Sequence, residues 1–128
     1  MVEVDKDTND LGYKVMGLAY KVHTTLGPGL LESAYEACLC HELEKEKIPF
    51  ERQKELPIVY DGKKLDCGYR IDILVANKII LELKTVEILQ PIHTAQLMTY
   101  LRLSKLHIGY LINFYSTSLK YGIKRYIL

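Results

Sequence analysis

Charged residues interrupt two apolar stretches near the middle of the chain. Asp72 lies within 71–75, and Glu82 and Lys84 interrupt the stretch that begins at residue 79. Apolar strands normally exclude charge, because an unpaired ion is costly to remove from water. Glu82 and Lys84 are two residues apart, so in a strand they project from the same face. If a turn at 76–78 pairs the two stretches, Asp72 lies near Glu82, and two carboxylates meet an ammonium group.

This combination of groups suits phosphate chemistry. Carboxylate oxygens are the preferred ligands of hard divalent cations such as Mg²⁺ or Mn²⁺. A lysine beside such a cation can orient or deprotonate a water, while the metal stabilises the phosphate transition state. For Asp72 alone, an exposed salt-bridge ladder on a half-solvated sheet remains an equal alternative. The apolar flanks of both stretches favour a functional site for the set as a whole.

The elements that must position these residues begin with two helices. Apolar residues recur at helical spacing over 11–26, with Thr8, Asn9 and Asp10 as candidate caps, and the pattern stops at Gly27-Pro28-Gly29. A second helix is expected over 30–47. A third is expected over 88–106, with Ile92 among its apolar residues.

Between the second and third helices the pattern changes to alternation. Strands are expected over 50–60, where Pro57 indicates an edge or a bulge, and over 64–75, with a hairpin turn at Asp61-Gly62. A turn at 76–78 leads to a third antiparallel strand over 79–84. The apolar run 108–114 is typical of a strand buried on both faces, and 119–127 predicts an edge strand. We therefore expect an α/β (or α+β) fold, one domain over 1–128, with a mixed sheet of four to five strands flanked by helices.

Composition restricts the class of protein. The chain has 128 residues, a net charge of +1 and 48% hydrophobic residues, which is ordinary for a globular domain and not strongly basic. No apolar segment is long enough to span a membrane, and the acidic N-terminus is unlike a signal peptide, so a cytoplasmic location is expected. Cys38-Leu39-Cys40-His41 has the wrong spacing for a zinc site, and small buried helix side chains are the favoured interpretation.

Two motifs give these residues a family resemblance. Asp72, nine intervening residues and then Glu82-Leu83-Lys84 resemble the motif of the PD-(D/E)XK nuclease superfamily, although Ile71 stands where its proline would be. The segment Gly29-Leu-Leu-Glu32-Ser-Ala-Tyr35 is similar to the G-x-x-E-x-x-Y signature of a small group within that superfamily. The resemblance extends from about residue 12 to the end of the chain and implies a restriction-endonuclease-like core.

The resemblance also implies roles for particular residues. Asp72, Glu82 and the backbone carbonyl of Leu83 would bind the metal, Mg²⁺ or Mn²⁺. Lys84 would act on the attacking water, so that Asp72, Glu82 and Lys84 form the catalytic set. Glu32 resembles a further helical carboxylate that many members direct at the metal. The alternative for Glu32 is a glutamate in a first helical turn, where the helix dipole favours it.

A third motif indicates the substrate side. Gln96-Leu-Met-Thr-Tyr100 resembles the Q-x-x-x-Y motif of RecB-like nucleases, and its spacing places both side chains on one helix face. His93 lies three residues earlier on that side, although a solvent-facing polar stripe explains His93 equally well. Tyr35 of the G-x-x-E-x-x-Y segment is expected to support the substrate together with these residues.

Three functional hypotheses follow. The first is a metal-dependent nuclease that hydrolyses phosphodiester bonds in DNA, or in RNA, with water as nucleophile. The second is a non-catalytic module that binds nucleic acid or protein and has retained the nuclease fold. The third is a domain that acts only as a homodimer or with a partner protein. The unbroken set of acidic residues and Lys84 favours the enzyme.

Overall fold

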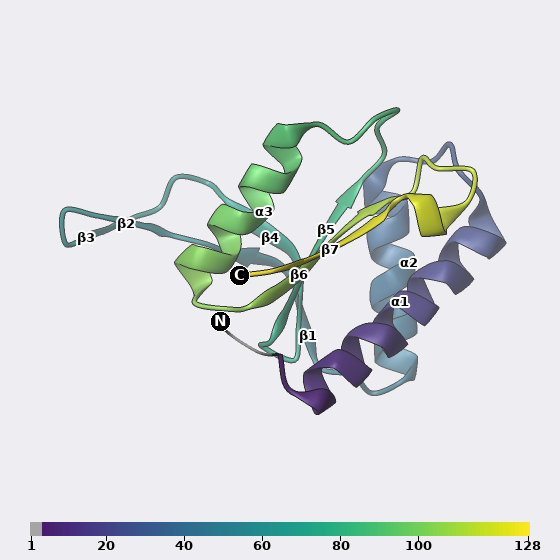
Figure 1. Ribbon diagram of the computed structural model, residues 1–128, viewed down its shortest axis with the longest axis horizontal. Coiled ribbons are helices and arrows are strands. Elements are labelled where there is room, and N and C mark those ends of the chain that lie inside the picture. The colour runs from purple at the N-terminus through teal and green to yellow at the C-terminus, as the bar shows by residue number, and fades with distance from the viewer. Residues whose placement is uncertain (1–3) are drawn as a thin grey trace.

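A five-stranded mixed sheet forms the centre of the computed structural model, which describes residues 4–128 (Figure 1). The strands are arranged in the order β1-β4-β5-β6-β7. Their bounds are β1 Phe50–Glu55, β4 Arg70–Val75, β5 Ile79–Lys84, β6 Ile108–Asn113 and β7 Ile123–Ile127. β5 and β6 are parallel, and every other neighbouring pair is antiparallel. The expected α/β fold with a mixed sheet is confirmed.

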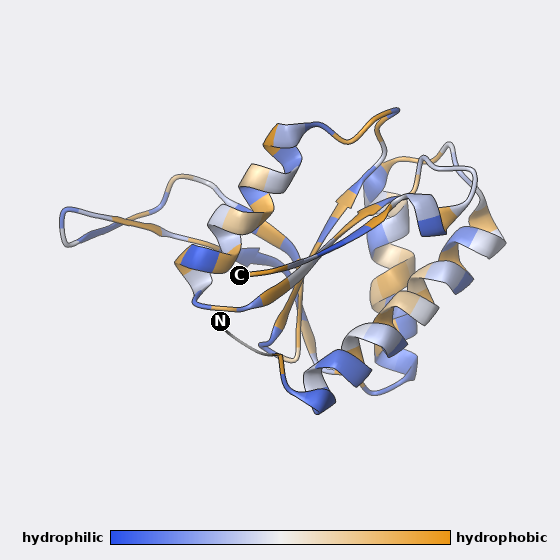
Figure 2. Cartoon of the chain, viewed as in Figure 1, coloured by the Kyte–Doolittle hydropathy of each residue, from blue (hydrophilic) through white to orange (hydrophobic). Residues whose placement is uncertain are grey.

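Three helices cover the two faces of this sheet. The helices α1 (Lys6–Leu26) and α2 (Glu32–Lys45) pack on one face, and α3 (Pro91–Ser104) lies on the other (Figure 1). α3 provides the crossover that two parallel strands require between β5 and β6. Figure 2 shows apolar residues concentrated in the sheet and polar residues along the outer surfaces of the helices. Among residues 4–128, no helix combines the length and apolar character needed to cross a bilayer.

The first helix begins one turn earlier than the sequence suggested. Its N-cap is Asp5, whose carboxylate accepts a hydrogen bond of 2.8 Å from the Thr8 amide. The expectation that Thr8, Asn9 or Asp10 caps the helix is therefore wrong. Polar residues in a first helical turn resemble caps when the first apolar residue, Leu11, is taken as the start of the helix.

The other two helices are shorter than expected, and their ends explain the difference. Leu31 has an extended backbone, so α2 starts at Glu32 rather than at residue 30, and the left-handed φ of 57° at Lys47 lies beyond its end. α3 starts at Pro91, since proline is well suited to a first helical position, and stops before Lys105, which is also left-handed. Ile92, one of the apolar residues of the expected helix, is 68% exposed.

The two long strands expected over 50–60 and 64–75 are each divided in two. β2 (Ile58–Tyr60) and β3 (Lys63–Leu65) form a separate two-stranded ribbon, which we call the arm and which projects from the sheet (Figure 1). The arm closes at its base where the Leu56 amide bonds the Tyr69 carbonyl at 3.0 Å. Pro57 follows at once and has no amide to continue a ladder. The predicted turn at Asp61-Gly62 lies at the tip of the arm.

The end of the chain contains one further difference. The edge strand expected over 119–127 begins only at Ile123, because residues Leu119–Tyr121 form a short 3-10 helix. Lys124 and Arg125 are exposed on this strand. The carbonyl of Gly122 accepts a hydrogen bond of 2.9 Å from the Asn113 amide, which joins the end of β6 to the start of β7.

Candidate active site

The pairing of β4 with β5 stops where the acidic residues begin. The last paired residues are Ile73 and Leu81, so Asp72 and Glu82 would come next. Their carboxylates bond to main-chain amides there: Glu82 Oε2 accepts from the Asp72 amide at 2.9 Å, and Asp72 Oδ2 accepts from the Leu83 amide at 2.8 Å. Asp72 and Glu82 therefore lie close together, as predicted. At this position their carboxylates take the place of the main-chain hydrogen bonds that would continue the pairing of β4 with β5.

Both carboxyl groups are removed from solvent without a neutralising partner. Glu82 is only 4% exposed, and Asp72 is half-buried. Neither forms an ion pair with a basic residue among residues 4–128. Burial, together with the neighbouring Asp72, raises the pKa of Glu82 to about 8, and burial also raises the pKa of Asp72. Burial therefore disfavours two negative charges side by side in the metal-free site.

Lys84 ends β5 beside these carboxyl groups. Its positive charge lowers the pKa of both Asp72 and Glu82, although burial outweighs that effect. The Lys84 carbonyl accepts from the Phe114 amide at 2.9 Å. The buried Asn113, paired with Lys84 across the sheet, donates to the Val86 carbonyl at 2.8 Å and accepts from the Val86 amide at 3.1 Å. Asn113 therefore holds the chain that leaves the site.

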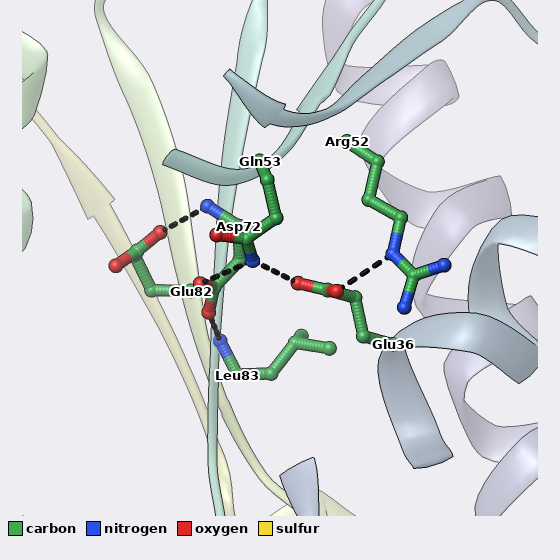
Figure 3. Close-up of polar contacts among 6 residues, drawn as sticks. All are labelled: Glu36, Arg52, Gln53, Asp72, Glu82 and Leu83. Carbon is green, nitrogen blue, oxygen red and sulfur yellow. Dashed lines mark hydrogen bonds and ion pairs between the residues drawn. The ribbon is translucent and has the colours of Figure 1, made fainter. Parts of the chain in front are cut away.

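A pocket of about 230 Å³ opens between α2 and the sheet beside Asp72. It is lined by residues of α2, β1, β4 and β5: Glu32, Ser33, Glu36, Gln53, Asp72 and Leu83. Glu32 is exposed at this pocket, whereas Glu36, one helical turn later, is 7% exposed. Figure 3 shows the carboxyl groups of Glu82 and Glu36 on opposite sides of Asp72. Glu32 and Asp72 thus share a pocket that Glu82 does not line.

The Q-x-x-x-Y pair lies on α3, across the sheet from the pocket beside α2 and on the face toward which Glu82 projects. Gln96 donates to the Tyr100 hydroxyl at 3.1 Å, which confirms that the two side chains share one face of α3. Burial, followed by the charges of Glu82 and Asp72, raises the pKa of Tyr100 to about 12. A second pocket, of about 360 Å³, lies beside them and includes His93 and Tyr69. His93 also accepts from the Gln90 amide at 2.9 Å, so it caps the helix.

Tyr35 has surroundings unlike those expected of a substrate contact. It is fully buried and stacks on Phe114 with ring centroids 4.4 Å apart. Its hydroxyl donates to the Gly27 carbonyl at 2.5 Å and accepts from the Leu30 amide at 3.2 Å. Tyr35 therefore holds the loop that leads into α2, and Glu32 is the first residue of that helix.

The cysteines and His23 differ in their burial. Burial raises the pKa of the Cys40 thiol to about 11, while Cys38 is half-buried and Cys67 is exposed on the arm side of β4. His23 is buried and lies 2.7 Å from the Ser116 carbonyl through Nε2.

The comparison with known families decides which fold family these features represent. A model described as the PD-(D/E)XK nuclease superfamily matches residues 9–126. The chain belongs to the PD-(D/E)XK nuclease superfamily. No curated protein and no solved structure gives a match.

PD-(D/E)XK nucleases typically use divalent metals, so the fit of the donor groups matters. Within residues 4–128, no three His, Cys, Asp or Glu side chains are grouped closely enough to hold a metal ion. The expected set of Glu32, Asp72 and Glu82 is thus not assembled, because Asp72 and Glu82 bond to main-chain amides and Glu32 is exposed. The donor chemistry still fits, since oxygen ligands with buried, uncompensated charge suit a hard divalent cation.

Two residues of this PD-(D/E)XK site did not stand out in the sequence. Glu36 is four residues after Glu32, which places both on one face of α2, and that spacing could have identified it. Gln53 lies in a polar strand whose neighbours are also polar. Only its position opposite Asp72 distinguishes it, and that position depends on the register between β1 and β4.

Proposed function

We propose that this PD-(D/E)XK protein is a divalent-metal-dependent nuclease that hydrolyses phosphodiester bonds in DNA, or in RNA. The observation that supports this proposal is the pair of carboxyl groups of the half-buried Asp72 and the buried Glu82, which have no basic partner in the described chain. Burying a carboxylate without compensation is costly. A cation bound at this position would recover that cost.

Asp72, Glu82 and the Leu83 carbonyl would hold Mg²⁺ or Mn²⁺, with Glu32 as a further ligand. Glu32 is exposed, and exposed side chains change rotamer freely, so it can turn toward the pocket that it shares with Asp72. When bound, the cation supplies Lewis acidity that stabilises the charge developing on the phosphate.

The remaining residues of the proposed site act on water and substrate. Lys84 would orient the attacking water and assist removal of its proton. Gln96 and Tyr100, with His93 beside them, would contact the nucleic acid from α3. Tyr35 would act through the loop that it holds, consistent with membership of the G-x-x-E-x-x-Y group. A homodimer or a partner protein would extend the short nucleic-acid surface of a chain whose net charge is only +1.

Replacement of Lys84 provides the direct test. We expect the wild type to cleave a linear, nicked, branched or single-stranded DNA, or an RNA, when Mg²⁺ or Mn²⁺ is added and not in EDTA. Lys84→Met should lower the rate by about a hundredfold or more, since proton transfer and water positioning contribute on that scale. The rate is measured with labelled substrates under single-turnover conditions.

The matched control is Lys78→Met, at the other end of the same hairpin. Lys78 is exposed and is the last residue of the turn before β5, so its loss changes the charge equally without touching the site. Equal rates for wild type and Lys84→Met would refute the catalytic role of Lys84. A folded wild type that binds nucleic acid but cleaves none of these substrates would favour the non-catalytic binding module instead.

A further inference from the structure

We propose that Gln53 is a positioning residue that sets the orientation of the Asp72 carboxylate. Its consequence for metal binding rests on the function proposed above, whereas the contacts themselves do not. Gln53 Nε2 donates to Glu36 Oε1 at 2.5 Å and to Asp72 Oδ1 at 3.4 Å. Figure 3 shows its carboxamide between the two carboxyl groups.

The backbone of Gln53 explains how its side chain reaches this place. Successive side chains of a strand point to opposite faces. Arg52 and Gln53 nevertheless both contact Glu36, Arg52 through an Nε–Oε2 bond of 2.7 Å. Gln53 has a φ of 53°, in the left-handed region. This conformation brings its carboxamide to the α2 side of the sheet, next to Arg52.

The left-handed backbone of Gln53 is energetically unfavourable, and the surrounding sheet holds it in place. A residue other than glycine in the left-handed region is destabilised relative to ordinary backbone. Gln53 is also left out of the pairing between β1 and β4, although the residues on either side, Arg52 and Lys54, pair with Ile73 and Ile71. Glycine or asparagine would avoid this cost, and strain of this kind is typically retained at functional positions.

A neutral amide suits this position electrostatically. One amide nitrogen carries two hydrogens, so it can donate to both carboxylates. The charge of Glu36 is balanced by Arg52, but Gln53 leaves the charge of Asp72 uncompensated. Asp72 is then held on both oxygens, Oδ1 by Gln53 and Oδ2 by the Leu83 amide at 2.8 Å. A lysine or arginine in place of Gln53 would neutralise Asp72 instead.

Two substitutions at Gln53 separate the effect of its side-chain amide from the effect of its left-handed backbone. Gln53→Ala removes the amide and keeps the strain, whereas Gln53→Gly removes both. We expect both variants to weaken Mn²⁺ binding by about tenfold or more, the usual effect of losing a residue that orients a metal ligand. Mn²⁺ affinity is measured by calorimetry, and Tm should be higher for Gln53→Gly than for Gln53→Ala. Lys105→Gly, at the left-handed end of α3, is the control and should raise Tm without changing Mn²⁺ affinity.

A double-mutant cycle makes the test independent of metal. The unfolding free energies of Gln53→Gly, Asp72→Ala and the double variant are compared in urea without metal. Non-additive effects support the contact between the two side chains, and additive effects overturn the proposal. Normal Mn²⁺ affinity in Gln53→Gly overturns it as well. If the wild type itself binds no Mn²⁺, the metal-dependent function fails, and the cycle alone decides the role of Gln53.

Discussion

The Glu82 carboxyl group combines deep burial with the absence of a counter-ion in the described chain. Its neighbour Asp72 is also acidic, and Lys84, whose charge lowers the pKa of Glu82, forms no ion pair with it within residues 4–128. Buried acids are usually compensated in this protein: Glu42, also buried, lies 2.5 Å from Lys21 and 3.4 Å from Lys45. Glu82 and Glu42 should therefore respond to pH in opposite ways.

For Glu82 the expected pH dependence follows from a pKa that is raised from 4.5 to about 8 on folding. The folded state holds the proton more tightly, so stability is full below about pH 4.5 and is lost as the pH rises toward 8. Gln cannot lose a proton, so Glu82→Gln should be more stable than the metal-free wild type at pH 8.5 and nearly equal at pH 5. The gain, up to a few kcal/mol, is measured by urea unfolding at each pH.

Glu42→Gln is the control of opposite sign. Its ion pair with Lys21 lowers the pKa of Glu42, so the stabilisation is present above the ordinary pKa and is lost in acid. This variant should be less stable than wild type at pH 7 to 8.5, with a smaller difference in acid. A Glu82→Gln gain that does not change between pH 5 and 8.5 would contradict the raised pKa of Glu82.

At the scale of elements, the packing of α1 on the sheet depends on one close approach. Gly12, buried in α1, faces Tyr110 of β6, which is 4% exposed. A Cβ atom at Gly12 would overlap the Tyr110 hydroxyl, whereas a Cβ at Gly17 of the same helix would meet nothing within 4 Å. The two glycines of α1 therefore differ in what lies opposite them.

Alanine substitutions at these two glycines should have opposite effects. Gly17→Ala should stabilise the protein by about 1 kcal/mol, because alanine is the better helix former. Gly12→Ala gains the same propensity but forces the buried Tyr110 ring to move, so we expect a net loss of about 1–3 kcal/mol. The free energies of unfolding of both variants are measured by chemical unfolding. Equal stabilisation by the two variants would show that α1 does not pack closely on Tyr110.

At the scale of the whole molecule, the arm is peripheral to the packed body. Val59 and Tyr60 are 64% and 73% exposed, and β2 and β3 pair only with each other among the described strands. The two buried clusters belong to the five-stranded sheet and its helices, and no residue of 58–65 contributes to them. Stability and the proposed site should therefore not depend on the outer part of the arm.

Shortening the arm tests this independence. Ile58 pairs with Leu65, so replacing 59–64 with Asn-Gly would leave a two-residue hairpin turn between paired residues. We expect the free energy of unfolding to change by about 0.5 kcal/mol or less, as is usual for surface positions, with unchanged Mn²⁺ affinity. The free energy of unfolding is measured in urea by circular dichroism. A loss of stability comparable to that of Gly12→Ala would show that the arm belongs to the cooperatively folding core.

The sequence by itself determined the order and type of most elements. Helical periodicity, the break at 27–29 and the apolar run at 108–114 depend on neighbours along the chain, and so they are visible without the fold. The motif around Glu82 and Lys84 is equally local, and the strand period places both on one face. The ends of the helices were less predictable, because they depend on caps such as Asp5 and Gln90.

Tertiary structure decided how the distant residues meet. The division of the long strands depends on Leu56 bonding Tyr69 and on an arm that leaves the sheet. The burial of Glu82, the internal place of Tyr35 and the arrangement of Glu36 and Gln53 around Asp72 depend on strand register and helix packing. These features depend on contacts between segments far apart in the chain, so local sequence patterns carry little information about them. The sequence thus specified which groups are present, and the packing specified their environment.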